Sequence, residues 1–533
     1  MIFKPFEDFE IIKFVLSLLS TVLMTYVVYY YYKYFTRVNP LPGPFPLPFI
    51  GIFPYVIWFK GDLIMFYKYC YEKYGDIYEL NNFIRSIVLC RAEYLEDVLS
   101  ESTHEIRLCF EGLKDLGIGG KGMTCNNNFK TWIFNRHFFN QAIFSPKFTN
   151  EVIDWTNEHF NELESYWDKL YFKEEIIKEN RNKLDFIKWF DHYTNDMIIK
   201  LLTGERSYSM AAYFHTLSDE KSDHPPAIFN DSVKLFQAFH TLHVGCFFFS
   251  IISPFLRRYV PFLKSIADDI LQNVNFINQK LDAIIKRRRQ EIEDTPSNKP
   301  LSHDILTSMI IKNTFHDNYI ETYEINRSMT DSEIRANLLD GITSGTYYKS
   351  ANLLSFIIYY IAHYPNVKKK MLEEIDRIFK GDKVRSINKD DFYNLKYCEA
   401  IVKEVARVHP IMHMNIRHIN KPNEIAGYQW PADTSFLVDI KAIHNSDNYW
   451  KEPNKFNPDR WMNESFEPKK NSFIMFGGGL RLCPGRKLAI VQLVCLIALL
   501  FRKYEINLVD MNSPIKTTCD VPIFVLLGSR SLR

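Results

Sequence analysis

The sequence predicts a mainly α-helical protein with small β-sheets and one N-terminal membrane-spanning helix. Three observations support this fold class. An uncharged apolar run stands near the N-terminus of the 533-residue chain. Helical patterns fill the middle of the chain, and only short alternating stretches are typical of strands. With 47% hydrophobic and 15% aromatic residues, the chain is able to bury a large apolar interior.

The uncharged run covers Phe14–Tyr32. At roughly 1.5 Å per helical residue it is just long enough to cross a bilayer core. Lys33 and Arg37 follow it, with no acid before Asp62. The positive-inside tendency therefore places the downstream chain in the cytosol. Tyrosines crowd the end of the run, as in an interfacial belt: Tyr26, Tyr29, Tyr30, Tyr31 and Tyr32.

These features predict three parts of the chain. Residues 1–35 form a single-pass anchor, residues 36–48 a stiff linker, and residues 49–533 one large domain. The linker contains five prolines between Pro40 and Pro48, which prevent a helix from continuing.

Helices and strands are indicated at several places in the domain. Thr330–Glu333, "TDSE", is a capping box that opens a long apolar segment running to about His363. An amphipathic helix is expected at Lys368–Phe379, and a strand at Ser435–Ile440.

Two further segments have competing interpretations. The basic run Lys286–Glu291 is interpreted as the solvated end of a helix. The apolar stretch Phe247–Phe255 is expected in the core, with a surface patch that dips into a membrane as the alternative.

Charge and cysteine usage exclude several classes of protein. The net charge of +2 gives no global field for nucleic acid, so none is expected as a partner. The nine cysteines are scattered and form no C-x-x-C pair, which argues against a disulfide framework and a zinc ribbon. Gly117–Gly122, "GIGGKG", lacks the following helix and acid of a dinucleotide site and is interpreted as a flexible loop.

The stretch "FGGGLRLCPGR" ends on a cysteine just before an apolar helical pattern. Free N–H groups and the helix dipole stabilise a thiolate at Cys483. Glycines let the backbone approach a flat object closely. Arg481 supplies a cation for an anionic group. A macrocycle with an iron centre and carboxylate arms meets these needs.

Phe476, Gly479, Arg481, Cys483 and Gly485 match F-x-x-G-x-R-x-C-x-G in full. This pattern resembles the haem-binding signature of the cytochrome P450 family. The resemblance implies the family's fold, haem b as the cofactor and Cys483 as the thiolate ligand of its iron.

Other motifs of the family follow in order along nearly the whole chain. Glu404 and Arg407 resemble its E-x-x-R motif, and Arg460 in "FNPDRW" resembles its second arginine, which together imply a structural lock. Trp132 and Arg136 resemble its W-x-x-x-R motif. The resemblance implies that three arginines bind the two haem propionates: Arg136, Arg417 and Arg481.

The central helix departs from the family pattern, in which an acid and an alcohol relay protons during dioxygen activation. If Gly345 is the family's glycine, Tyr347 takes the place of the acid and Tyr348 that of the alcohol. Counting back from Pro365 instead places Tyr348 at the acid and Lys349 at the alcohol.

Thr346 and Ser350 offer hydroxyls near these positions. We therefore take Thr346, Tyr347, Tyr348 and Ser350 as the candidate catalytic residues. An unperturbed tyrosine, with a pKa near 10, passes protons poorly. Three alternatives remain open. In the first, a hydroxyl with ordered water relays the protons and the protein is a monooxygenase. In the second, the protein is a hydroperoxide isomerase or dehydratase that needs no O2 or reductase. In the third, it is a catalytically impaired haem-binding paralogue.

The resemblance favours the first alternative, in which one atom of O2 is inserted into an apolar small molecule. Electrons come from NADPH through NADPH-cytochrome P450 reductase, docking near Cys483, and cytochrome b5 is a second partner that the family allows. The membrane is that of the endoplasmic reticulum, with the catalytic domain in the cytosol. The substrate pocket is expected near Thr346 and Tyr347, at the loop Gly117–Cys125, and at Met412 and Met414.

Overall fold

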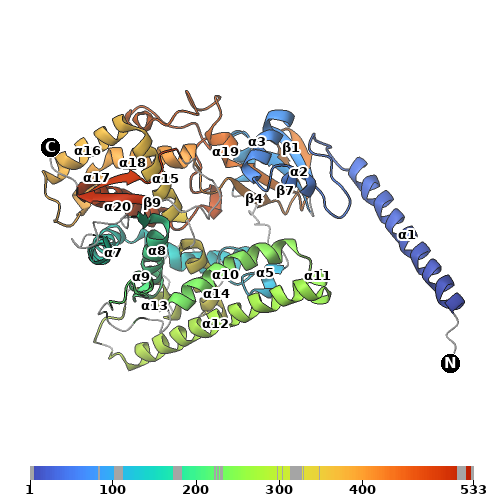
Figure 1. Cartoon of the computed structure of the whole chain (residues 1–533), viewed down its shortest axis with the longest axis horizontal. Helices are drawn as coiled ribbons and strands as arrows, with labels where there is room; N and C mark the ends of the chain where they lie inside the picture. The colour runs from blue at the N-terminus through green and yellow to red at the C-terminus, as the bar shows by residue number, and fades with distance from the viewer. Residues whose placement is uncertain are drawn as a thin grey trace. The chain divides into compact units, whose positions relative to one another are not determined.

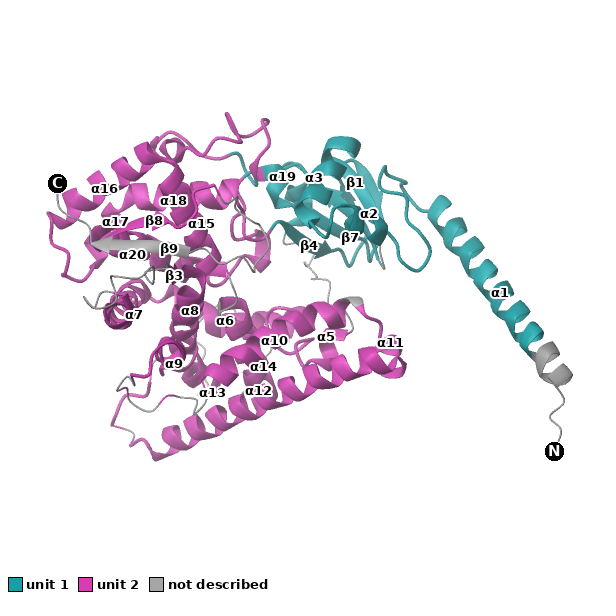
Figure 2. Ribbon diagram, viewed as in Figure 1, with its two compact units in different colours: residues 1–106, 413–443, 469–472 teal, residues 107–412, 444–468, 473–533 magenta. Residues whose placement is uncertain are grey.

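The computed structural model describes residues 5–81, 84–100, 112–171, 183–220, 224, 227, 232–296, 298–302, 304–311, 327, 329–346, 349–512 and 524–529. They form two compact units, which Figure 2 colours separately. Unit 1 comprises residues 1–106, 413–443 and 469–472, and unit 2 comprises residues 107–412, 444–468 and 473–533. Helices dominate the described chain and the strands are short (Figure 1), so the predicted fold class is confirmed.

Unit 1 begins with a long apolar helix, α1. Its residues 12–35 are long and apolar enough to cross a membrane, as the sequence predicts. The other elements follow the proline segment and return after residue 412. The elements of unit 1 are α1 (Pro5–Phe35), α2 (Phe53–Trp58), α3 (Leu63–Tyr74), β1 (Ile77–Asn81), β2 (Arg85–Leu89), α4 (Leu95–Val98), β4 (Met414–His418), β5 (Asn423–Ile425), β6 (Tyr428–Trp430), β7 (Ser435–Asp439) and α19 (Ile440–His444), the last residue of which lies in unit 2.

A four-stranded sheet organises unit 1, in the order β1-β2-β7-β4. β2 pairs with β7 in parallel, and the other two pairings are antiparallel. The strand expected at Ser435–Ile440 is therefore found as β7, one of the two interior strands, which ends one residue earlier at Asp439. The short strands β5 and β6 form a separate antiparallel hairpin.

A buried carboxylate binds the proline segment to this sheet. Glu79 on β1 is 1% exposed and pairs with two guanidiniums: Arg37 at 2.5 Å and Arg85 at 2.6 Å. Arg85 also donates to the carbonyls of Val38 and Asn39, both at 2.7 Å. The segment therefore packs on the sheet from its first residues.

Unit 2 contains most of the helices and a three-stranded antiparallel sheet in the order β3-β9-β8. Its helices are α5 (Gly112–Asp115), α6 (Phe129–Phe144), α7 (Phe148–Tyr171), α8 (Phe186–Thr203), α9 (Ser209–Leu217), α10 (Ser232–Ile251), α11 (Pro254–Tyr259), α12 (Pro261–Asp294), α13 (Ile305–Ile310), α14 (Asp331–Thr346), α15 (Lys349–His363), α16 (Pro365–Phe379), α17 (Lys389–Asn394), α18 (Lys396–Val408) and α20 (Arg486–Lys503). Two 3-10 turns and three strands complete it: η3 (Pro458–Met462), η4 (Gly479–Arg481), β3 (Lys183–Asp185), β8 (Tyr504–Leu508) and β9 (Phe524–Ser529).

The core of unit 2 is built around α8, which packs against α14 and α15. Two glycines one turn apart allow α14 to approach α8 closely. A Cβ at Gly341 would lie 2.9 Å from Leu202, and one at Gly345 would lie 2.5 Å from Ile198. Gly345, the reference glycine in one alignment of the central helix, is thus a packing residue.

The capping box predicted at Thr330 is confirmed. The Glu333 carboxylate accepts the Thr330 amide at 2.9 Å, and the Thr330 hydroxyl accepts the Glu333 amide at 3.3 Å. Since these two bonds satisfy backbone donors that lack helical partners, α14 begins where the sequence places it.

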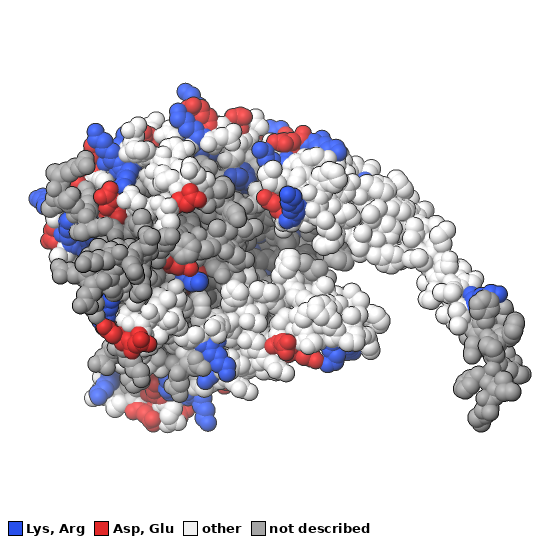
Figure 3. Space-filling view, in the orientation of Figure 1, with Lys and Arg blue, Asp and Glu red and all other residues white. Residues whose placement is uncertain are grey.

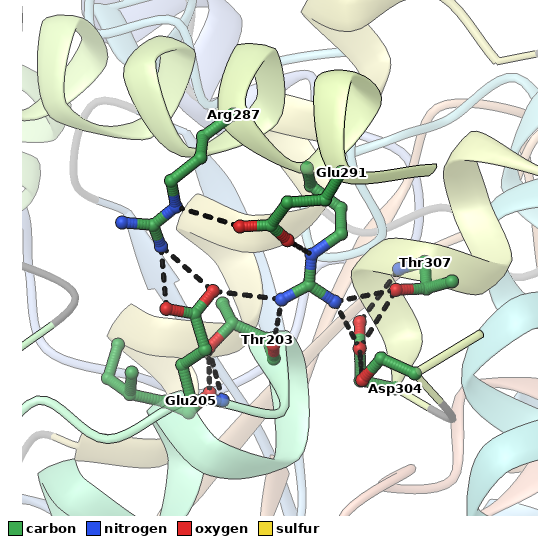
Figure 4. A network of polar contacts seen from close by, with 9 residues as sticks. Thr203, Glu205, Arg287, Glu291, Asp304 and Thr307 are labelled. Carbon is green, nitrogen blue, oxygen red and sulfur yellow. Dashed lines mark hydrogen bonds and ion pairs between the residues drawn. The ribbon is translucent and has the colours of Figure 1, made fainter. Parts of the chain in front are cut away.

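The interpretation of Lys286–Glu291 as a solvated helix end is wrong for one residue. Arg288 on α12 is 5% exposed. It belongs to the polar network in which Figure 4 labels Thr203, Glu205, Asp304 and Thr307. Its guanidinium donates to Asp304 at 2.5 Å, to the Thr203 carbonyl at 2.9 Å and to Glu205 at 2.8 Å. The network connects α12 to the end of α8 and the start of α13. The neighbouring Arg287 is exposed, as expected.

The core prediction for Phe247–Phe255 holds for only part of the stretch. Phe249 is 3% exposed, whereas Phe247 and Phe255 are 64% and 67% exposed. The stretch spans the end of α10 and the start of α11, so its side chains point in different directions. The alternative of an apolar surface patch therefore describes Phe247 and Phe255.

Candidate functional site

The cysteine loop precedes α20 and is closed by a backbone hydrogen bond. The Cys483 amide donates to the Phe476 carbonyl at 3.0 Å. Gly477 and Gly479 have φ angles of +78° and +63°, which side chains rarely tolerate. These two glycines explain how the segment Phe476–Cys483 turns back on itself and presents the cysteine at the end of the turn.

Cys483 is half-buried and stands three residues before the first residue of α20. A Cβ at Gly485 would lie 3.9 Å from the Cys483 sulfur, in ordinary contact. The amide groups of the first turn of α20 have no partners within the helix and carry partial positive charge.

Several other cysteines lie in surroundings that favour the neutral thiol. Burial raises the pKa of Cys70 and Cys246 to about 12 and also raises those of Cys90, Cys398 and Cys495. A thiolate at these five positions would lose its solvation without compensation. They are better explained as small apolar core residues than as ligands.

Two arginines and a tryptophan surround the cysteine loop. Arg136 on α6 donates to the Leu482 carbonyl at 2.6 Å, next to Cys483. Arg481 is 4% exposed, and its guanidinium carbon lies 4.1 Å from the centre of the Trp132 ring. The structure therefore brings together four of the residues that the sequence singled out.

The loop Gly117–Cys125 also belongs to this part of unit 2. Gly117 and Gly120 have φ angles of +72° and +85°, and the Gly120 amide donates to the Cys125 carbonyl at 3.1 Å. Arg481 donates to the carbonyls of Met123 and Asn126 at 3.3 and 2.7 Å. Gly117–Gly122 is a loop between α5 and α6, as expected, and hydrogen bonds attach the segment that contains it to the cysteine loop.

The predicted lock of Glu404, Arg407 and Arg460 is confirmed as a buried cluster. Glu404 and Arg407 have no exposed surface, and they pair through bonds of 3.0 and 2.8 Å. Arg460 donates to the same carboxylate at 3.1 Å. Trp461 does so at 2.9 Å, an additional donor that the sequence motif did not indicate. Arg407 also donates to the carbonyls of His444 and Pro453. These bonds attach the segment 444–453, which precedes the cysteine loop in the chain, to α18.

Arg417 lies in unit 1, on β4. It is 1% exposed and donates to the Asn415 side chain at 2.5 Å and to the Ile416 carbonyl at 3.1 Å. A guanidinium retains its charge when buried, so this position holds a cation within the sheet.

Two of the four candidate catalytic residues lie within the described chain, one in each of two successive helices. Thr346 is the last residue of α14, and Ser350 is half-buried in the first turn of α15. Tyr347 and Tyr348 lie outside the described residues.

The sequence reading missed Asp340 on α14. Its carboxylate is 2% exposed and accepts the amides of Met123 and Thr124. A single acid between Leu338, Leu339 and Ile342 in an apolar helix was the signal that could have identified it.

The residues around Cys483 suit a haem on chemical grounds. A thiol follows a bare glycine turn at a helix N-terminus, and two guanidiniums and an indole lie beside it. A thiolate suits an iron ligand, and guanidiniums suit carboxylate arms.

Comparison with known proteins agrees with this arrangement. The family model described as Cytochrome P450 matches residues 41–530. Cytochrome P450 3A14 of Cavia porcellus is 26% identical over 499 residues, covering 92% of this chain and 90% of that protein. Cytochrome P450 3A31 of Mesocricetus auratus is 25% identical over 508 residues, with coverages of 92% and 90%.

Solved structures show the same fold. The heme domain of cytochrome P450DA superposes with a TM-score of 0.73 at 17% identity, covering 93% of this chain and 99% of that one. A mutant of the same heme domain gives a TM-score of 0.74 at 18% identity, with coverages of 93% and 98%.

Proposed function

Because this chain belongs to the cytochrome P450 family of haem-thiolate monooxygenases, we propose that it inserts one oxygen atom of O2 into an apolar small molecule, with electrons from NADPH. The family uses haem b and a reductase that delivers these electrons. The observation that carries the proposal is the closed loop that presents Cys483 at the start of α20 beside Arg136 and Arg481.

Cys483 is proposed as the thiolate ligand of the haem iron. When bound, haem supplies an iron centre for O2 activation, and thiolate donation favours O–O cleavage. Phe476, Gly479 and Gly485 shape the turn, and Arg136 holds it through the Leu482 carbonyl. These contacts are proposed to hold the backbone of Cys483 in one position.

The haem carboxylates are proposed to bind to Arg136, Arg417 and Arg481. Each guanidinium offers donors in a planar fork that matches a carboxylate. Trp132 supports Arg481 by stacking beneath it at 4.1 Å, which limits the orientations of the fork.

Proton delivery is proposed to use the hydroxyls at the junction of α14 and α15. Thr346, Tyr347, Tyr348 and Ser350 are the candidates, because hydroxyls both accept and donate and so pass a proton along a chain with ordered water. The substrate pocket is proposed to lie along α14 and the loop Gly117–Cys125, with Met412 and Met414, which follow Pro410, as further contributors.

The chain is proposed to contact the endoplasmic reticulum membrane at two places, with the catalytic part, residues 49–533, in the cytosol. Residues 1–35 form the anchor, and residues 36–48 connect it. A second contact is proposed on unit 2, over α10, α11 and α12. Its exposed apolar side chains are Val244, Phe247, Phe255, Leu256, Tyr259 and Phe262, of which Phe262 is 71% exposed. On the face that Figure 3 draws, the surface in the region of α11 is mostly uncharged, with charged side chains at its edge. An exposed apolar patch of this kind favours lipid.

NADPH-cytochrome P450 reductase, and cytochrome b5 as a second donor, are proposed to dock on the face near Cys483. Arg486 and Lys487 follow the cysteine loop directly and carry positive charge there. An acidic partner surface would be steered to such a face, with an association rate that falls as salt rises.

The first experiment is the reduced, CO-bound absorption spectrum of the purified membrane protein, compared with Cys483→Ser. The matched control is Cys246→Ser, which removes another half-buried thiol of unit 2. We expect a strongly red-shifted Soret band in the wild type and the control, and its loss in Cys483→Ser. A Cys483→Ser protein that binds haem and keeps the band would overturn the ligand assignment.

The second experiment separates the reaction types. Reconstituted with the reductase, the protein is expected to consume NADPH and O2 and to form an oxygenated product from members of an apolar compound panel. An isomerase or dehydratase would instead convert a hydroperoxide without NADPH or reductase. It would form no oxygenated product from the panel when NADPH and reductase are supplied.

A further inference from the structure

The peptide of Met123 lies between the central helix α14 and the cysteine loop. Its amide donates to the Asp340 carboxylate at 2.6 Å, and its carbonyl accepts from Arg481 at 3.3 Å. The next amide, that of Thr124, donates to the same oxygen of Asp340 at 2.7 Å. One residue therefore connects a buried acid on α14 to an arginine two positions before Cys483.

A second side chain holds the same segment from α6. Asn135 is fully buried, and its amide group donates to the carbonyls of Lys121 and Gly122 at 2.7 and 3.0 Å. The segment Lys121–Asn126 is thus bound by α14, by α6 and by the cysteine loop. Because three different elements bind so short a segment, its backbone is held in one position relative to them.

Gly122 is the point of closest approach to α14. A Cβ at this position would lie 2.2 Å from Asp340 Oδ2 and 3.0 Å from the Ala336 carbonyl. These distances leave no room for a side chain. The glycine is therefore required by the contact with Asp340 rather than by loop flexibility.

The carboxylate of Asp340 is better suited to binding the loop Gly117–Cys125 than to relaying protons. It is 2% exposed, and one oxygen is occupied by two amide donors. Amide bonds to a carboxylate are stronger than those between neutral groups. Asp340 also stands six residues before Thr346, about 9 Å along the helix at 1.5 Å per residue. It is therefore distant from the hydroxyls proposed for proton delivery.

We propose that Asp340 is a positioning residue for the substrate pocket. It fixes the loop Gly117–Cys125 against α14, in the position that Arg481 also binds, and so sets the size and shape of apolar substrate that the pocket accepts. The proposal rests on the proposed function, because it assumes that this loop and α14 line the pocket.

The first test needs neither haem nor substrate. Amide hydrogen exchange in the peptide covering residues 117–126 is expected to rise at least about tenfold in Asp340→Ala, because two amides lose their acceptor. Asp340→Asn, whose side-chain oxygen can still accept both amides, is expected to stay close to the wild type. Ser344→Ala, at an exposed position of the same helix, is the control and should change nothing.

The second test measures selectivity in the haem-loaded protein with two iron-binding probes of different size. Imidazole needs little space, whereas 4-phenylimidazole places a phenyl ring in the pocket. Asp340→Ala is expected to weaken 4-phenylimidazole about tenfold relative to imidazole, while the CO spectrum per haem is retained. Asp340→Asn should restore the ratio of the two affinities.

Gly122→Ala provides a second route to the same contact. It is expected to raise exchange in the loop and lower the affinity ratio, and its effect should be less than additive with Asp340→Ala, since the smaller side chain removes the clash. Unchanged exchange and an unchanged affinity ratio in Asp340→Ala would overturn the proposal. If Cys483 failed as the haem ligand, the exchange measurement would still decide whether Asp340 holds the loop.

Discussion

The carboxylate of Glu404 receives two hydrogen bonds from Arg407, at 3.0 and 2.8 Å, with both side chains fully buried. Arg460 and Trp461 donate to the same carboxylate. A buried charge shared in this way depends on every partner, because removal of one leaves the others without compensation.

Arg407→Lys is therefore expected to lower the free energy of unfolding by roughly 3–5 kcal/mol. A lysine ammonium is a point charge and cannot reproduce the paired bonds to Glu404 or those to the carbonyls of His444 and Pro453. Urea unfolding would measure the loss. Lys403→Met, which removes a partly exposed pair with Glu399 on the same helix, should change stability by less than about 1 kcal/mol. Equal effects of the two substitutions would contradict the role of the cluster.

Arg136→Ala is expected to loosen the cysteine loop, because the bond of 2.6 Å to the Leu482 carbonyl is lost. The fraction of protein with the red-shifted CO band should fall during storage at room temperature, in favour of a band at shorter wavelength. Lys130→Ala removes an exposed cation from the same helix and is the control. A stable band in Arg136→Ala would show that the loop holds Cys483 without this contact.

Glu333→Gln is expected to change how stability depends on pH. Burial alone would raise the pKa of Glu333, but hydrogen bonds from Arg327 and Thr330 outweigh it and lower the pKa to about 2 from an ordinary value of 4.5. A lowered pKa stabilises the fold above pH 4.5, and this contribution is lost as the pH falls from 4.5 towards 2. Since the site is partly solvated, we expect a difference of about 1 kcal/mol at pH 7.

The measurement is the free energy of unfolding of the wild type and Glu333→Gln between pH 7 and pH 4. The difference between the two proteins should be constant at neutral pH and narrow below pH 4.5. Glu373→Gln, which removes an exposed carboxylate on α16, is the control. A difference that widens as the pH falls would show that the sign of the linkage is wrong.

Arg288→Met and Arg287→Met should differ strongly although the residues are adjacent. Loss of Arg288 leaves the Asp304 carboxylate, 2% exposed, without its guanidinium, which costs roughly 3–5 kcal/mol in comparable buried pairs. Arg287 is 43% exposed and pairs with Glu205 at the surface, so its loss should cost less than about 1 kcal/mol. Similar costs, measured by urea unfolding, would contradict the burial of Arg288.

Features whose partners lie within one helical turn could be predicted from the sequence. Thr330 and Glu333, and likewise Glu404 and Arg407, are three residues apart, so their spacing alone places them together. The cysteine loop could be predicted for a related reason, since its glycines and Cys483 lie within one short stretch.

Features whose partners are distant in the chain could not be predicted. Arg288 meets Thr203, which lies 85 residues away, and Asp340 meets Met123 at a separation of 217 residues. In the sequence of its own helix, neither Arg288 nor Asp340 differs from a polar residue without a structural role. The exposure of Phe247 depends on which neighbours cover α10, and composition carries no information about that.

The ion pairs of Glu79 determine how far the chain can be shortened from its N-terminus without loss of stability. Arg37 stands only two residues beyond the apolar helix, yet it supplies one of the two guanidiniums bound to this carboxylate. A shortened protein that begins at Val38 should express poorly and lose roughly 3–5 kcal/mol of stability, as after the loss of one partner from a buried pair. One that begins at Tyr34 should match the parent in thermal denaturation when both are measured in the same detergent. The useful boundary for a soluble version thus lies inside the apolar helix and not at its end.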